Sequence, residues 1–229
     1  MLEALKSEVW QANLALPKHG LVTLTWGNVS AVDATREWMV IKPSGVAYEE
    51  LKPEDMVVLR ISDGVVVEGS LRPSSDTPAH LVLYRAFGEI KGVVHTHSTW
   101  ATIWAQAGQA IPVMGTTHAD FAGGPIPCTR DLRREEVQEA FEANTGKTIV
   151  QTFAAGEYKV VPAVLVRGHG PFCWGSGAMD AVHHAIMLEE VAKMAYYTQM
   201  LNPKAKLNPH VAGRHFSRKH GPQAYYGQT

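Results

Sequence analysis

The sequence predicts a single α/β domain with three layers, in which helices cover both faces of a mixed, mainly antiparallel sheet. Helical and short strand-like segments alternate along the chain, and hairpin signals are frequent. No internal repeat, low-complexity tract or linker divides it. We therefore expect one catalytic domain over 1–229, whose polar C-terminal tail, about 203–229, contributes to the active site.

The first half of the chain begins with apolar residues at helical spacing from Leu2 to Leu16, which predict an amphipathic helix that Pro17 ends. Further on, Asp63-Gly64 predicts a tight hairpin turn, and Pro78 suits the first position of a helix capped by Thr77. In order, we expect a helix over 2–16, strands over 21–25, 29–32 and 38–41, a hairpin of 56–61 with 65–68, and a helix over 78–87.

In the second half, an apolar run ends in His95-Thr96-His97 and predicts a strand, and Gly108 closes the helix that follows. A charged stretch then favours a helix, and two runs rich in β-branched residues favour strands. In order, we expect a strand over 92–97, a helix over 98–106, a helix over 131–143, strands over 148–153 and 160–167, and a long helix over 178–200.

Composition excludes several classes of function. The formal net charge is −1, and no basic stripe indicates a nucleic-acid partner. Cys128 and Cys173 are far apart and do not form a disulfide framework, so a reducing cytoplasm is the expected setting. The N-terminus has no apolar signal core, and charged residues interrupt the most apolar helix, so we expect no membrane span.

Three histidines predict a metal site. His95 and His97 are two residues apart on a predicted strand and so share a face, and His169 follows a second apolar run. Three neutral imidazoles leave a tetrahedral ion one open position, which is typical of a catalytic site. The alternative is a pair of satisfied histidines at the end of a strand.

Three short loops predict a phosphate site, because glycine allows close backbone approach, serine adds donors and lysine adds charge. Each loop alone is compatible with an ordinary turn. The loops are Gly27-Asn28, Lys42-Pro43-Ser44-Gly45 and Ser74-Ser75.

Acid/base candidates lie nearby and in the tail. Asp76 is either a metal neighbour or general base, or a carboxylate that stabilises a helix start. Asp120 is either a catalytic acid/base or a turn aspartate. Tyr225-Tyr226 either docks on a neighbouring surface or enters an active site, and the basic residues before it suit either solvent or a phosphate ester.

These motifs together resemble the class II aldolase and epimerase family. The resemblance covers nearly the whole chain, from the first helix to the closing Ala224-Tyr225-Tyr226-Gly227-Gln228. Within the family, the pattern is most similar to the enzymes that epimerise L-ribulose 5-phosphate at C4. The motifs that carry it are Thr23-Leu24-Thr25-Trp26-Gly27-Asn28-Val29-Ser30, Lys42-Pro43-Ser44-Gly45, Pro73-Ser74-Ser75-Asp76-Thr77-Pro78, His95-Thr96-His97 and His169-Gly170-Pro171-Phe172.

The resemblance implies zinc, one ion per subunit, and interconversion of L-ribulose 5-phosphate with D-xylulose 5-phosphate by cleavage and re-formation of the C3–C4 bond. It also implies a C4 homotetramer with active sites at subunit interfaces. Asp76, where related aldolases usually carry glutamate, favours epimerisation over a zinc aldolase, and a non-catalytic metal or sugar-phosphate binding protein is a further alternative.

The same resemblance implies a role for each site residue. These roles are zinc ligation by His95, His97 and His169 with Asp76 close by; phosphate contact by Asn28, Lys42, Ser44, Gly45, Ser74 and Ser75; acid/base catalysis by Asp120 and Tyr226; and support from Thr116, Glu142, His215 and Arg218.

Overall fold

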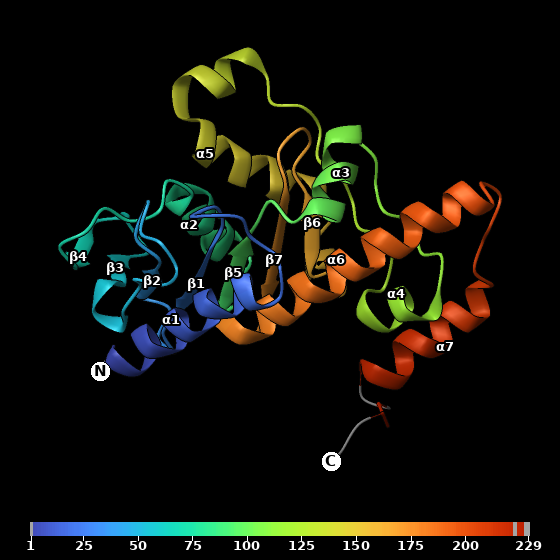
Figure 1. The fold of residues 1–229 in the computed structure, drawn as a ribbon, viewed down its shortest axis with the longest axis horizontal. Helices are drawn as coiled ribbons and strands as arrows, with labels where there is room; N and C mark the ends of the chain where they lie inside the picture. The colour runs from blue at the N-terminus through green and yellow to red at the C-terminus, as the bar shows by residue number, and fades with distance from the viewer. Residues whose placement is uncertain (1, 222–223, 227–229) are drawn as a thin grey trace.

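A seven-stranded sheet runs through the middle of the molecule in the order β4-β3-β2-β1-β5-β7-β6 (Figure 1). Each neighbouring pair is antiparallel. The computed structural model describes residues 2–221 and 224–226. The strands are β1 (Asn28–Val32), β2 (Trp38–Ile41), β3 (Val57–Arg60), β4 (Val66–Glu68), β5 (Gly92–His95), β6 (Ala163–Leu165) and β7 (Pro171–Gly175).

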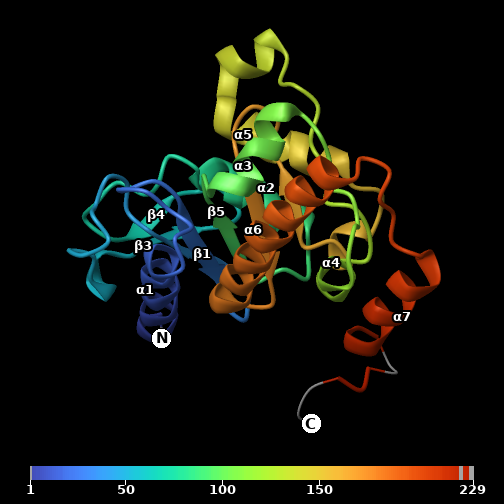
Figure 2. The same ribbon diagram turned by 45° about the vertical axis from the view of Figure 1, so that its right-hand side comes forward.

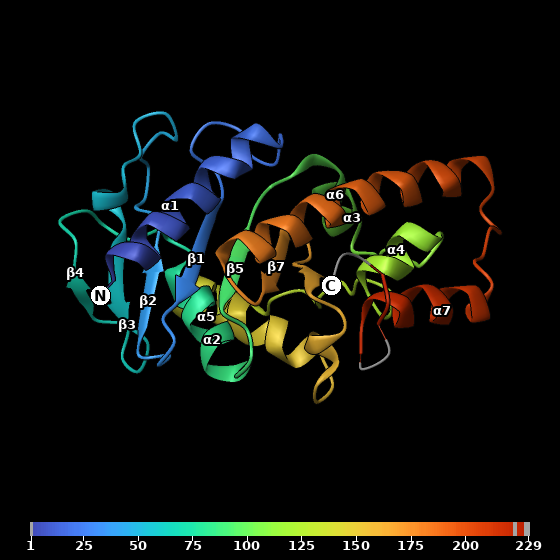
Figure 3. The ribbon, with the colours of Figure 1, turned by 90° about the horizontal axis from the view of Figure 1, so that it is seen from below.

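Helices cover both faces of this sheet, which confirms the three-layer α/β/α architecture. Seen from below, α1, α3 and α6 lie on one side of the strands, and α2 and α5 lie on the other (Figure 3). Two short 3-10 turns, Pro53–Asp55 and Glu157–Lys159, complete the elements. The helices are α1 (Glu3–Lys18), α2 (Thr77–Ala86), α3 (Thr99–Ala107), α4 (Thr116–Phe121), α5 (Arg134–Thr152), α6 (Ala178–Leu201) and α7 (Pro209–Lys219).

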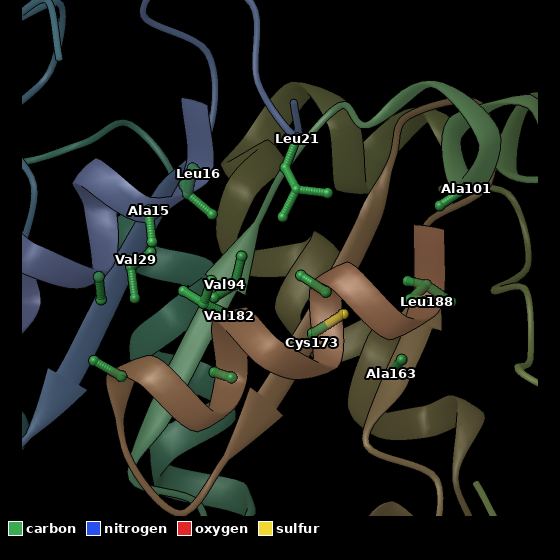
Figure 4. Packing of buried hydrophobic residues seen from close by; sticks show 14 of the residues in the cluster. Ala15, Leu16, Leu21, Val29, Val94, Ala101, Ala163, Cys173, Val182 and Leu188 are labelled. Carbon is green, nitrogen blue, oxygen red and sulfur yellow. The ribbon is translucent and has the colours of Figure 1, made fainter. Parts of the chain in front are cut away.

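Alternation along the strands divides the core into two clusters. Val29, Val94 and Cys173 point to the side of α1 and α6, where Val182 and Leu188 of α6 pack on them (Figure 4). The alternate strand residues face α2 and α5. Each fully buried side chain of this size contributes about 1.5–3 kcal/mol, so the sheet holds its register firmly where the site is built.

Several elements match their sequence-based predictions closely. The strand over 38–41 is β2, the Asp63-Gly64 hairpin joins β3 to β4, and the long helix is α6. Gly108 ends α3 in the left-handed conformation with φ 65°. Glycine is the natural residue there because it lacks the Cβ that penalises positive φ.

Two predicted strands are wrong. Residues 21–25 form a turn rather than a strand, with Leu24 left-handed at φ 54°. Residues 148–153 mostly continue α5, because Ile149 packs in the cluster with α2 and because the hydroxyl of Thr148 donates to the Asn144 carbonyl one helical turn back. Packing therefore overrides the strand preference of these β-branched residues.

Some boundaries differ by one to three residues. Pro17 lies inside the last turn of α1 instead of ending it. Asp76, rather than Thr77, occupies the cap position of α2. β5 ends at His95, so His97 lies just beyond the strand, and β6 covers only the middle of the run predicted over 160–167.

Three elements lack a predicted counterpart: β7, the short helix α4 and the tail helix α7. Asn208 caps α7 by accepting a hydrogen bond from the His210 amide. The helix lies beside α4, away from the sheet (Figure 2). No residue of α7 is buried, so its sequence carries no pattern of core residues. In the part of the chain that the structure describes, no helix is long and apolar enough to cross a bilayer.

Candidate metal and phosphate site

A cavity of about 320 Å³ opens at the end of β1 and β5, where the loops 23–28, 42–46 and 72–76 meet. It contains all ten residues predicted to bind metal or phosphate. The lining residues are Thr25, Trp26, Gly27, Asn28, Lys42, Pro43, Ser44, Gly45, Ser74, Ser75, Asp76, His95, His97 and His169.

The three histidines come together although they lie on separate segments. His95 is the last residue of β5, held between Asn28 of β1 and Phe172 of β7 by strand pairing. His97 follows two residues later, and His169 lies in the turn between β6 and β7. Each offers a ring nitrogen within 4.8 Å of those of the other two. The three histidines therefore face one point, as predicted, and the turn between β6 and β7 supplies His169.

The geometry of these rings fits a divalent metal ion. Nδ1 of His95 lies 3.0 Å from the Pro171 carbonyl, which accepts its proton and leaves Nε2 free to ligate. Nε2 of His97 is 3.2 Å from Nε2 of His95. Two nitrogens about 2.05 Å from one tetrahedral ion would be separated by about 3.3 Å, so the spacing suits zinc.

The protonation of the rings suits metal ligation as well. Burial, together with the neighbouring His95 and His97, lowers the pKa of His169 to about 4, and burial also lowers the pKa of His97. Both rings are therefore neutral near pH 7, as metal ligands must be. Nδ1 of His169 is buried and has no hydrogen-bond partner among the described residues, which counts against a merely satisfied structural histidine.

Asp76 borders the cavity without joining the histidine cluster. The Asn28 amide donates to Oδ2 of Asp76 at 2.6 Å and to the Ser74 hydroxyl at 3.0 Å. Burial works against ionisation of Asp76, but His95 and His80 and the Asn28 bond outweigh it and hold its pKa below the usual range. Among the described residues, the metal-binding group consists of the three histidines, so Asp76 is a charged neighbour of that group.

Lys42 supplies a buried cation to the cavity lining. Its side chain is 1% exposed, and its ammonium donates to the Val46 carbonyl at 2.7 Å and lies 4.9 Å from the Tyr48 ring centre. Burial lowers the pKa of Lys42 to about 8. The amide of Ser74 donates to the Lys42 carbonyl, which joins the loops 42–46 and 72–76. An anion bound in the cavity would therefore favour the charged ammonium of Lys42, which burial disfavours.

Asp120 contacts the tail in a second group of polar side chains, which we call the α4–α7 cluster: Asp120, His215, Arg218, Lys219 and Tyr226. Arg218 donates to both carboxylate oxygens of Asp120, and Nδ1 of His215 lies 3.0 Å from Oδ1. Burial opposes the ionised form, but these two partners outweigh it and keep the pKa of Asp120 low. The Tyr226 ring packs under Arg218 and Lys219, with centroid distances of 4.7 and 4.6 Å.

The remaining predicted residues lie outside the cavity. Thr116 begins α4, the helix that carries Asp120. Glu142 follows a kink at Ala140 in α5. The α4–α7 cluster also contributes no residue to the cavity lining of its own chain. One chain thus carries the predicted residues in three separate places: the cavity, the region of α4 and α7, and Glu142 in α5.

Trp26 is a cavity residue that the sequence-based predictions did not include. Trp26 is 53% exposed, and its ring lies 6.1 Å, centre to centre, from that of His97. The signal that could have found it is its position directly before Gly27-Asn28 in a predicted phosphate loop.

Comparison with known proteins gives the chain its family. Residues 7–196 match the model of the class II aldolase and adducin N-terminal domain. An L-fuculose 1-phosphate aldolase is 25% identical, with a TM-score of 0.78, over 94% of this chain and 95% of that one. The YgbL protein of Escherichia coli is 22% identical, with a TM-score of 0.75, over 93% and 98% of the two chains. An L-fuculose 1-phosphate aldolase from Glaciozyma antarctica PI12 is 19% identical, with a TM-score of 0.76, over 97% and 84%. The chain belongs to the class II aldolase and adducin N-terminal domain family.

Proposed function

We propose that the protein interconverts L-ribulose 5-phosphate and D-xylulose 5-phosphate by cleaving and remaking the C3–C4 bond. The observation that carries the proposal is one cavity with three metal-binding histidines and, in the loops opposite, a buried lysine among serines and glycines. Family membership supports sugar-phosphate chemistry. Asp76, in place of the glutamate usual in related aldolases, favours epimerisation.

The reaction explains why both ends of the cavity are needed. The hydrogen on C4 is not adjacent to the C2 carbonyl, so removing it would give no stabilised carbanion. Breaking the C3–C4 bond avoids this, since negative charge then develops beside the carbonyl. A zinc ion held by His95, His97 and His169 would supply Lewis-acid stabilisation of that charge.

The chain's own groups would bind and orient the fragments. Lys42 and the serine amides and hydroxyls would hold the phosphate, so the two-carbon aldehyde would stay in the cavity. Its carbonyl group could then rotate to present the opposite face. Return of the three-carbon fragment to the opposite face then inverts C4. Each orientation of the C4 hydroxyl needs its own acid/base group, and we assign these roles to Asp120 and Tyr226.

Because the α4–α7 cluster does not line the cavity of its own chain, we propose that a second copy supplies it. The low pKa of Asp120 keeps it ionised near pH 7, as a base requires. A C4 homotetramer with sites at its interfaces would join each cavity to the cluster of a neighbour. Thr116 and Glu142 would support that side of the site, and one zinc ion would serve each subunit.

A zinc-dependent aldolase acting on a related sugar phosphate is the second candidate. The 25% identity with an L-fuculose 1-phosphate aldolase over nearly the whole chain favours it. An aldolase would release the aldehyde and the three-carbon ketone, whereas an epimerase would return both to one product.

The test is to incubate the zinc-loaded protein with L-ribulose 5-phosphate and to measure D-xylulose 5-phosphate and free dihydroxyacetone separately. The epimerase proposal predicts xylulose phosphate as the main product, with loss of turnover in chelator and recovery on adding zinc. Dihydroxyacetone as the main product would instead establish the aldolase. Absence of turnover on this substrate would reject the proposal.

A further inference from the structure

Trp26 combines an exposed ring with a fixed backbone. The Tyr48 hydroxyl lies 2.9 Å from the carbonyl oxygens of both Trp26 and Gly27 and donates to this pair. The Trp26 amide donates to the Thr23 carbonyl at 3.1 Å. Gly27 has φ 80°, and a Cβ there would lie 2.9 Å from the His95 carbonyl. The loop is therefore seated against the strand that bears His95, while the indole remains open to the cavity.

The Trp26 ring lies beside the metal-binding histidines, and its loop also adjoins residues proposed to bind phosphate. It tilts toward the His97 imidazole, whereas its own chain continues through Gly27 into Asn28, which contacts Ser74 of the phosphate loops. Apart from the histidines, Trp26 is the aromatic residue among those that line the cavity. The carbon chain of a bound sugar phosphate would have to cross this space.

A sugar chain presents C–H groups as well as hydroxyls, and an indole face attracts C–H groups and excludes water. We propose that Trp26 binds the substrate, with its indole stacking on the carbon chain between the phosphate and the metal ligands. The ring face carries no hydrogen-bond donor that would fix one orientation. A further part of the proposal rests on the proposed function: after cleavage, the Trp26 indole retains the aldehyde phosphate in the cavity and still lets its carbonyl present either face.

The first test measures binding without turnover. L-arabinitol 5-phosphate has no carbonyl and cannot be cleaved, so calorimetry with zinc-loaded protein reports binding of the whole carbon chain and phosphate without turnover. Inorganic phosphate reports the phosphate contacts by themselves. Trp26→Ala should weaken arabinitol phosphate about tenfold and leave inorganic phosphate within about twofold. Trp26→Phe should recover most of the loss. Leu24→Ala is the matched control, because Leu24 is 77% exposed in the same loop but does not line the cavity.

Binding of arabinitol phosphate that is equal in Trp26→Ala and wild type, or undetectable in wild type, would overturn the inference. A parallel loss of inorganic phosphate binding would overturn it too, because the substitution would then act through the phosphate loops. Unchanged zinc content and circular dichroism establish that the variant is folded.

The second test measures leakage during turnover of L-ribulose 5-phosphate. Glycerol dehydrogenase and NADH detect dihydroxyacetone that escapes. Trp26→Ala should raise the ratio of dihydroxyacetone to xylulose phosphate about tenfold over wild type and Leu24→Ala; an unchanged ratio would overturn the retention role. If wild type binds arabinitol phosphate through Trp26 but does not epimerise, the proposed function fails while the stacking role stands.

Discussion

Raising the pH from 7 to 9 is expected to weaken binding of a sugar phosphate, because Lys42 loses its charge over this range. With a pKa of about 8, the ammonium is about 90% protonated at pH 7 and about 10% at pH 9. If the charged form binds the phosphate, the apparent affinity falls about tenfold. The ligand contributes little to this change, since the second pKa of a phosphate monoester is about 6.

The assay is calorimetry of L-arabinitol 5-phosphate at several pH values, with Lys42→Met as the test variant. Lys42→Met should bind weakly and with little dependence on pH. Lys6→Met is the matched control, since Lys6 is also buried, at 5% exposed, but is paired with Glu68 at 2.7 Å outside the cavity. A wild-type affinity that is constant from pH 7 to 9, or a Lys42→Met profile that follows wild type, would refute the assignment.

Folding stability should change with pH in the opposite direction: it should rise as the pH rises, whereas phosphate binding weakens. The pKa of Lys42 is about 8 when folded and 10.5 in the unfolded chain, so the unfolded state binds more protons between these values. The free energy of unfolding of wild type relative to Lys42→Met should therefore rise through this window, by about 3 kcal/mol in total. Urea denaturation at pH 7.5 and pH 10 measures this difference, and a fall would contradict the burial argument.

Three further predictions concern the metal, the loop and the tail. His97→Asn should lower zinc content and activity together, measured by metal analysis and turnover; full activity after verified metal removal would exclude the zinc mechanism. Gly27→Ala should lower the free energy of unfolding by about 2–4 kcal/mol in urea denaturation, because a Cβ would meet Val22 and the His95 carbonyl at 2.8 and 2.9 Å. Gly20→Ala is the control: Gly20 also has positive φ but faces open space, so the loss should be only about 1–2 kcal/mol. Equal losses would contradict the contact argument. Tyr226→Phe should abolish epimerisation while zinc and phosphate binding persist, and mixing it with His97→Asn under subunit exchange should restore activity; verified exchange without recovery would count against a site shared between chains.

Local patterns predicted the parts of the site that strands and their adjoining loops position. His95 and His97 are close in sequence, and apolar runs lead to both His95 and His169, so strand periodicity combined with three histidines favoured a shared metal. The sheet layers followed from the same alternation. The turn around Leu24 could not be read this way, because its apolar residues resemble a strand while the backbone takes a left-handed conformation.

Long-range partners were the part that local patterns could not supply. Asp120 meets Arg218 and His215 across 98 and 95 residues of sequence, and no periodicity encodes that pairing. The tail helix depends on these polar contacts rather than on burial, so hydrophobic patterning missed it. Trp26 was missed although it directly precedes Gly27-Asn28, because that position does not by itself show that the residue lines the cavity.

The placement of the three histidines has a consequence for how the protein resists unfolding. His95 ends one strand, and His169 lies in the turn that joins the next two, so an ion bound by both would cross-link neighbouring parts of the sheet. Unfolding would then have to release the ion, and the melting temperature would depend on free zinc. At a hundredfold excess over the dissociation constant, mass action adds about 2.7 kcal/mol. The supply of zinc would thus regulate the stability of the folded chain as well as its catalytic activity.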